Sequence, residues 1–235
     1  MQTLLDHHAG KPDVYHVLNA AAGGSPVVMW LKGHKNYGRT YARMMKNYVS
    51  ENAEKLEGRP PPTVAFCQQF LQGAFGDRRV GIEGPEDNDR IRLGADTFFR
   101  LAEQFREDGM RIVYIAAHIY KKPMEPEIGN ERLALRALLD CGHDYIRSGP
   151  DVWEPMRDAF PSGFSAVDKV HLCVSGARIM AELWYLAIAS TMARDEVIRM
   201  MHAEPFPDFV KTESKRKAGR ARRLKARQER EANDR

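Results

Sequence analysis

Residues 93–117, LGADTFFRLAEQFREDGMRIVYIAA, decide the fold class of this chain of 235 residues. Apolar residues recur at helical spacing over 93–107, which predicts an amphipathic helix. Gly109 ends that helix, and the β-branched run at 111–117 predicts a buried strand. A helix followed at once by a buried strand is the second half of a β-α-β unit, so the strands of the sheet are expected to be parallel.

Further strands and helices alternate along the rest of the chain. The patterns predict buried strands at 26–31 and 63–67, short strands at 80–82 and 145–146, helices at 39–56, 130–141 and 176–202, and a loop rich in Pro, Gly and Ser at 148–166. Because strands and helices alternate, we expect a mainly parallel sheet with helices on both faces, a three-layer α/β/α sandwich.

Length and composition indicate one folded domain with two flanking segments. Hydrophobic residues make up 43% of the chain and charged residues 29%, which excludes general disorder. We expect a polar N-terminal arm at 1–24, the α/β domain at 25–207 and a basic tail at 208–235. The first twenty residues have no apolar run typical of a secretory signal, and the apolar stretch 183–189 is too short to span a bilayer. The sequence therefore predicts no membrane contact.

Three cysteines, Cys67, Cys141 and Cys173, are widely spaced and include no CxxC pair. This pattern argues against a disulfide framework and against a metal site, and it favours buried free thiols in a reducing compartment. We therefore expect a cytoplasmic protein, or one packaged in a particle assembled in the cytoplasm. The phosphate-binding motifs GxxxxGK[ST] and GxGxxG are absent, so no cofactor is expected.

The tail carries the positive charge of the whole protein. Residues 211–235 contain eleven Lys and Arg against four acidic residues, a net charge of +7, whereas the rest of the chain sums to −3. A basic segment without aromatic residues is expected to bind the phosphates of nucleic acid or another polyanion without reading bases. The alternative is a solvated extension that docks an acidic protein partner. On a helix, four arginines would share one face: Arg216, Arg220, Arg223 and Arg227.

The most informative pair of polar residues is Asp168 and His171, which precede the last expected helix. An Asp three residues before a His can hold the Nδ1–H of the imidazole, which leaves Nε2 free to act as a general base. The spacing alone is also compatible with a surface Asp and a His packed at a helix start, because D-x-x-H is frequent by chance. His118, at the end of the strand at 111–117, lies where α/β proteins tend to bind ligands, although a histidine that only caps the strand end is the commoner outcome.

The surroundings of this pair resemble a known family. The segment Asp168-Lys-Val-His171-Leu, followed by Ser175-Gly176 and the last helix, is similar to the closing block of the SGNH (GDSL-type) hydrolases. The resemblance implies a flavodoxin-like three-layer fold, with Asp168 as the orienting acid and His171 as the base of a Ser-His-Asp triad. Lipases, esterases, acyltransferases and carbohydrate deacetylases belong to this family.

Two other blocks of the family have altered counterparts here. The resemblance places the nucleophile just after the first strand, where Lys35 stands instead of serine. A lysine there is protonated near neutral pH and forms no ester intermediate. Asn88, in the acidic turn at 84–89, is the loose counterpart of the asparagine that the family uses in its oxyanion hole, and a solvated turn is the alternative.

Three functions follow from these observations. The first is a non-catalytic SGNH-like domain with a binding or structural role. The second is an active acyl-ester hydrolase whose nucleophile is displaced from the position of Lys35. The third is an accessory protein, of a nucleoprotein or virion-like assembly, that binds a polyanion through its tail.

Overall fold

The computed structural model describes residue 21 and residues 24–50, 64–76, 81–122 and 125–189. The tail expected at 208–235 lies outside the described residues. The arm expected at 1–24 also lies outside them, except for residues 21 and 24. So do the end of the helix expected at 39–56 and residues 190–202 of the last expected helix.

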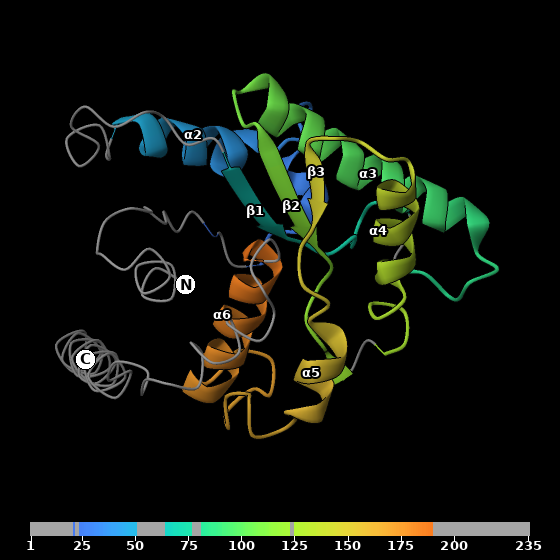
Figure 1. The fold of residues 1–235 in the computed structure, drawn as a ribbon, viewed down its shortest axis with the longest axis vertical. Helices are drawn as coiled ribbons and strands as arrows, with labels where there is room; N and C mark the ends of the chain where they lie inside the picture. The colour runs from blue at the N-terminus through green and yellow to red at the C-terminus, as the bar shows by residue number, and fades with distance from the viewer. Residues whose placement is uncertain (1–20, 22–23, 51–63, 77–80, 123–124, 190–235) are drawn as a thin grey trace, which may run out of the picture.

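A small sheet of three parallel strands organises the described part of the chain (Figure 1). The strands are β1 (Val64–Gln68), β2 (Ile112–Ala116) and β3 (Ile146–Ser148), in the order β1-β2-β3. Helix α3 (Asn88–Glu107) lies between β1 and β2 along the chain, and α4 (Glu131–Asp140) lies between β2 and β3. The predicted α/β class and parallel sheet are therefore confirmed.

The stretch at 93–117 folds as its pattern predicts, as the end of α3 followed by β2. Gly109 adopts a φ of 96°, a left-handed conformation that favours glycine. The amide of Met110 donates to the carbonyl of Phe105 at 3.0 Å, which satisfies a terminal carbonyl of α3 as the chain turns away. The helix therefore ends where the strand must start.

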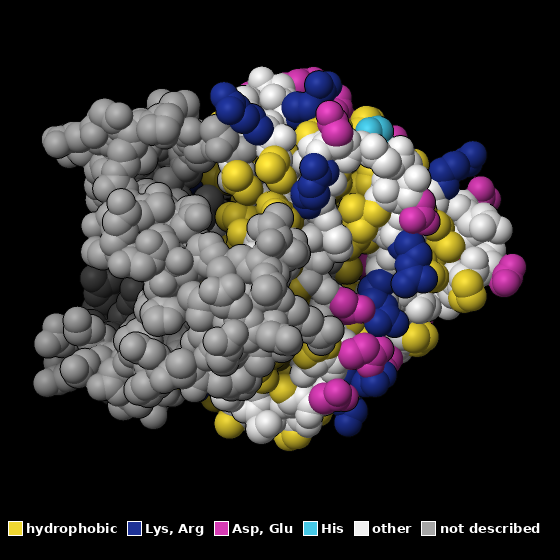
Figure 2. Space-filling view, in the orientation of Figure 1, with side chains coloured by type: hydrophobic (Ala, Val, Ile, Leu, Met, Phe, Trp, Pro, Cys, Tyr) yellow, Lys and Arg dark blue, Asp and Glu magenta, His cyan; other side chains and the backbone are white. Residues whose placement is uncertain are grey.

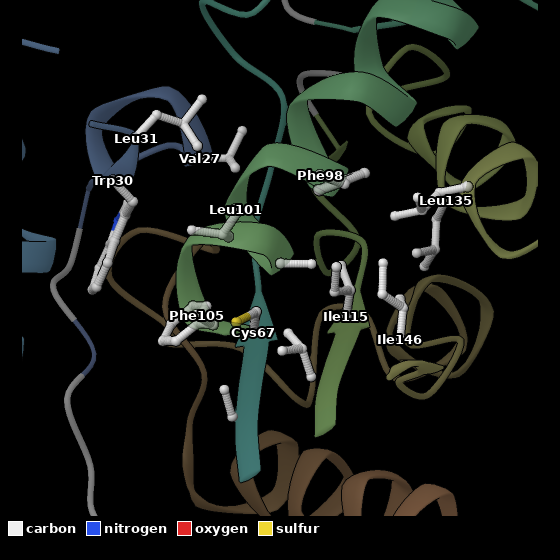
Figure 3. Packing of buried hydrophobic residues seen from close by; sticks show 14 of the residues in the cluster. Val27, Trp30, Leu31, Cys67, Phe98, Leu101, Phe105, Ile115, Leu135 and Ile146 are labelled. Atoms are coloured by element: carbon white, nitrogen blue, oxygen red, sulfur yellow. The ribbon is translucent and has the colours of Figure 1, made fainter. Parts of the chain in front are cut away.

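One face of the sheet carries the main hydrophobic core. Figure 3 shows Cys67, Ile115 and Ile146 from the three strands beside Phe98 of α3 and Leu135 of α4. Residues two apart on a strand point to the same face, so alternate strand residues enter this core. A Cβ on Gly94 of α3 would lie 2.8 Å from the Cβ of Ala134 on α4, so the absence of a side chain at Gly94 lets the two helices touch.

The prediction of a strand at 26–31 is wrong. Val27–Trp30 forms a short 3-10 helix, η1, in which Val27 and Trp30 are buried. The side chain of Gln104 on α3 holds its end: Nε2 donates to the carbonyl of Trp30 at 2.9 Å, and Oε1 accepts from the amide of Lys32 at 2.8 Å. A buried strand would need a neighbouring strand to take these backbone groups, and here one side chain takes them.

The remaining elements depart from expectation in smaller ways. Residues 81 and 82 belong to no strand, and the amide of Ile82 donates to the carbonyl of Glu127 instead. The loop expected at 148–166 contains a helix, α5 (Trp153–Asp158). In the region of the helix expected at 39–56, the structure has a short 3-10 helix, η2 (Tyr37–Arg39), followed by α2 (Tyr41–Ser50). The last described helix is α6 (Val174–Ile188).

A second hydrophobic cluster joins α5 and α6 to the carboxyl edge of the sheet. It includes Ala116, which ends β2, together with Trp153 of α5 and Trp184 of α6. Trp184 also packs edge-on against Phe66 of β1, with ring centroids 5.7 Å apart. In Figure 1, α5 and α6 accordingly lie toward the arrowheads of the strands. The described residues contain no helix that is both long and apolar enough to cross a membrane.

Candidate functional site

Asp168 and His171 lie on a hairpin that connects α5 to α6. Phe164 and Leu172 pair as an antiparallel bridge, and the amide of Ser165 donates to the carbonyl of His171 at 2.7 Å. The amide of Lys169 donates back to the carbonyl of Ser165 at 3.0 Å and closes the turn. These bonds give a loop rich in polar residues a defined shape.

The carboxylate of Asp168 organises the tip of this hairpin. Its Oδ1 accepts the backbone amides of Val170 and His171, both at 2.9 Å, and its Oδ2 lies 2.7 Å from Nδ1 of His171. The amides of His171 and Val170, followed by the imidazole, lower the pKa of Asp168 to about 2. Asp168 therefore stays ionised throughout the neutral range and holds the Nδ1–H of His171.

The imidazole of His171 projects into solvent. Its side chain is 82% exposed, and within the described part of the chain no hydroxyl or thiol makes a hydrogen bond to Nε2. With Nδ1–H held by Asp168, the Nε2 lone pair is left to accept a hydrogen bond or a proton. The structure brings together the acid and the base proposed from the sequence and places no nucleophile beside them.

Lys35 and Asn88 lie elsewhere. Lys35 is exposed in the turn between η1 and η2, and Asn88 is exposed at the first position of α3. Among the described residues, no hydrogen bond or ion pair connects either of them to Asp168 or His171. In Figure 1 the first turn of α3 lies at the right edge, away from the loop between α5 and α6 at the bottom. Because 26–31 is not a strand, Lys35 does not follow a strand of the sheet, and the roles of both residues stay predictions.

The four tail arginines, Arg216, Arg220, Arg223 and Arg227, lie outside the described residues. On the described part of the face in Figure 2, Lys and Arg side chains alternate with Asp and Glu, and no patch of a single sign forms there. The polyanion hypothesis is drawn from the tail, none of which lies among the described residues.

Burial of free thiols is confirmed for one cysteine only. All three are free; Cys67 is buried, Cys141 is exposed and Cys173 is half-buried. Cys141 lies at the end of α4, where its side chain faces water, so the prediction of buried thiols is wrong for it. Among the described residues, no group of three His, Cys, Asp or Glu is arranged to hold a metal ion.

Sequence reasoning missed two polar residues. Cys173 occupies the position just before α6, and its Sγ lies 3.0 Å from the hydroxyl of Ser175. Burial raises the pKa of this thiol, but hydrogen bonds from Ser175 and the first turn of α6 outweigh it and lower the pKa overall. Its place two residues after His171 was the available signal. Glu131, in the first turn of α4, is fully buried. Its Oε1 accepts the amide of Leu71 at 3.0 Å, and its Oε2 has no hydrogen-bond partner among the described residues. An acid at a helix start is common, so the sequence offered no signal for it.

His118 is held in place after β2. Its ring packs against Phe70 with centroids 4.9 Å apart, and Nδ1 lies 2.8 Å from the carbonyl of Ile119. That carbonyl can only accept, so Nδ1 carries the hydrogen. Burial lowers the pKa of His118, which keeps the ring neutral and favours the capping role.

Comparisons with protein-family models, with curated proteins and with solved structures find no match. Fold and site together define an α/β protein with a small all-parallel sheet that presents an Asp–His pair on an exposed hairpin.

Proposed function

We propose that this chain is a divergent SGNH-type α/β domain that acts by binding or as a structural protein, without hydrolysing esters. The similarity of its closing block to that superfamily supports the proposal, as does the parallel sheet with helical connections. We also propose the three-layer arrangement, with α3 and α4 in one layer and α6 in the other. Phe66, which contacts Trp184 of α6, and the core residue Cys67 are consecutive on β1 and so point to opposite faces.

The observation that carries the non-catalytic proposal is the environment of His171. In a serine hydrolase the base accepts a hydrogen bond from the nucleophile, at roughly 2.6–3.2 Å. Here Asp168 orients the imidazole as such a base requires, yet no nucleophile in the described residues reaches Nε2. Lys35, at the nucleophile position by resemblance, is exposed and has no bond to the pair.

Ester hydrolysis is the direct test. The full chain, its His171→Ala variant and a His143→Ala control would be assayed with p-nitrophenyl esters and with a fluorophosphonate probe. His143 is a suitable control because its ring stacks on Phe99, away from the hairpin. We expect background hydrolysis in all three proteins and no covalent label.

The opposite result identifies the alternative function. Hydrolysis that disappears in His171→Ala and persists in His143→Ala would show an active acyl-ester hydrolase with a displaced nucleophile. The residue labelled by the probe would then be that nucleophile. Such an outcome would overturn the non-catalytic proposal.

A second candidate function rests on the tail. The net charge of +7 over residues 211–235 favours binding to nucleic acid or another polyanion. Duplex DNA and RNA binding would be measured at several salt concentrations with the full chain and with a chain ending at residue 210. We expect deletion to lower both the affinity and its salt dependence; unchanged values for both would refute this role and leave an acidic protein as the partner of the tail.

A further inference from the structure

The base of the hairpin is closed by two glycines. The carbonyl of Gly163 accepts the amide of Cys173 at 3.1 Å, and a Cβ added to Gly176 would overlap that same carbonyl oxygen. A Cβ on Gly163 would in turn lie 3.5 Å from the Cα of Gly176. The two backbones are thus in direct contact where the hairpin meets the first turn of α6.

Side chains strengthen the same junction. The carbonyl of Ser162 accepts hydrogen bonds from the Sγ of Cys173 at 3.0 Å and from the hydroxyl of Ser175 at 3.2 Å. Phe164, the first residue beyond the glycine, is 4% exposed and belongs to the cluster shared with α5 and α6. The base of the hairpin is therefore held by packing and by side-chain and backbone hydrogen bonds.

The tip has no comparable support. Val167 is 89% exposed and His171 is 82% exposed, and the carboxylate of Asp168 bonds only within the tip among the described residues. The backbone bond from Ser165 to His171 continues the ladder that starts at Gly163 and Cys173. These backbone bonds connect the closed base to the turn that carries Asp168 and His171.

We propose that Gly163 and Gly176 are positioning residues, whose backbone contact closes the hairpin and so holds the carboxylate of Asp168 on the imidazole of His171. This inference goes beyond the proposed function, because it concerns how the pair is held and not what the pair does. It adds that the site depends on two residues that do not touch it. A side chain at Gly176 pushes the Gly163 carbonyl away, opens the base and loosens the pair at the tip.

The test is the pKa of Asp168 in the full chain, followed through its ¹³C carboxyl resonance. The pKa is about 2 in the wild-type chain, against an ordinary value of 3.8, because the amides at the tip and the imidazole stabilise the ionised form. In Gly176→Ala we expect it to rise toward the ordinary value and the Nδ1–H resonance of His171 to broaden or disappear. Helix propensity favours alanine over glycine at this position, so a rise in the pKa of Asp168 would not come from a weakened α6. Gly84→Ala is the control, since a Cβ there meets nothing within 4 Å.

A second variant covers the case in which Gly176→Ala fails to fold. Cys173 has a φ of −82°, close to that of proline, so Cys173→Pro fits the backbone at this position. It deletes the amide that bonds to the Gly163 carbonyl, crowds that oxygen with the proline ring, and leaves Gly176 unchanged. The pKa of Asp168 is expected to rise in this variant as well. A low pKa retained in the folded variants would overturn the positioning role and leave the proposed function untouched. Conversely, ester hydrolysis that depends on His171 would overturn the proposed function and leave the positioning role standing.

Discussion

Glu131 should make the stability of this protein fall as the pH rises. Its side chain is fully buried in the first turn of α4, and within the described structure Oε2 has no hydrogen-bond partner. Burial raises its pKa well above the ordinary 4.5, against the opposing effect of the Leu71 amide, which donates to Oε1. The folded protein therefore keeps a proton on Glu131 at a pH where the unfolded chain has released it.

The sign and size of the effect follow from this difference. Below about pH 4.5 the carboxyl is protonated in both states, so the free energy of unfolding does not depend on it. Above that pH the folded state binds more protons, and the free energy of unfolding falls by up to about 1.4 kcal/mol per pH unit. The decline ends once the pH passes the raised pKa of the folded state.

Glu131→Gln isolates this contribution. The amide has nearly the same shape and still offers an oxygen to the Leu71 amide, but it does not ionise. We expect the free energy of unfolding of the variant, minus that of the wild-type chain, to increase steadily from pH 5 to pH 8. Urea titrations followed by tryptophan fluorescence at each pH would measure it, because all three tryptophans are buried.

Two further variants complete the experiment. Glu86→Gln, the same substitution at an exposed turn residue, is the matched control. Glu131→Leu should destabilise by about 1–3 kcal/mol at pH 4.5, because it leaves the buried Leu71 amide without an acceptor. This loss should shrink as the pH rises, as in Glu131→Gln, because leucine does not ionise either. A constant difference between Glu131→Gln and the wild-type chain from pH 5 to pH 8 would refute the reasoning.

Three other predictions concern packing and reactivity. Gln104→Leu should lower the free energy of unfolding, measured by urea titration, by about 2–4 kcal/mol, because the carbonyl of Trp30 and the amide of Lys32 each lose a hydrogen-bond partner. A loss below about 0.5 kcal/mol, the size of a typical surface substitution, would contradict the role given to Gln104. Gly94→Ala should cost about 1–3 kcal/mol, since the new Cβ would lie 2.7 Å from Leu71 Cδ1, whereas Gly38→Ala, where nothing lies within 4 Å, should stay within about 0.5 kcal/mol of the wild-type chain. Burial raises the pKa of the Cys67 thiol to about 12, so this thiol should not react at pH 8 in the folded protein. A thiol reagent should therefore modify exposed Cys141 in the folded protein and Cys67 only in urea, as read out by peptide mass spectrometry. Equal rates of modification in the absence of urea would show that Cys67 is accessible.

The sequence by itself determined the features that depend on local spacing. The periodicity over 93–107, Gly109 and the β-branched run after it were enough to predict α3 and β2, because a helix face and a strand face repeat within a few residues. The contact between Asp168 and His171 is equally local, since only two residues lie between them in the chain.

Tertiary structure alone decided the features that depend on distant partners. The run at 26–31 is apolar enough for a strand, yet it folds as η1 because Gln104, 74 residues from Trp30, takes its backbone groups. The burial of Glu131 depends on Leu71, 60 residues away, and nothing in the local pattern records it. For Asp168 and His171, local sequence and tertiary structure each determine one feature. Their spacing predicts that the two side chains meet. The packing of the hairpin places them in solvent, with no nucleophile beside them among the described residues.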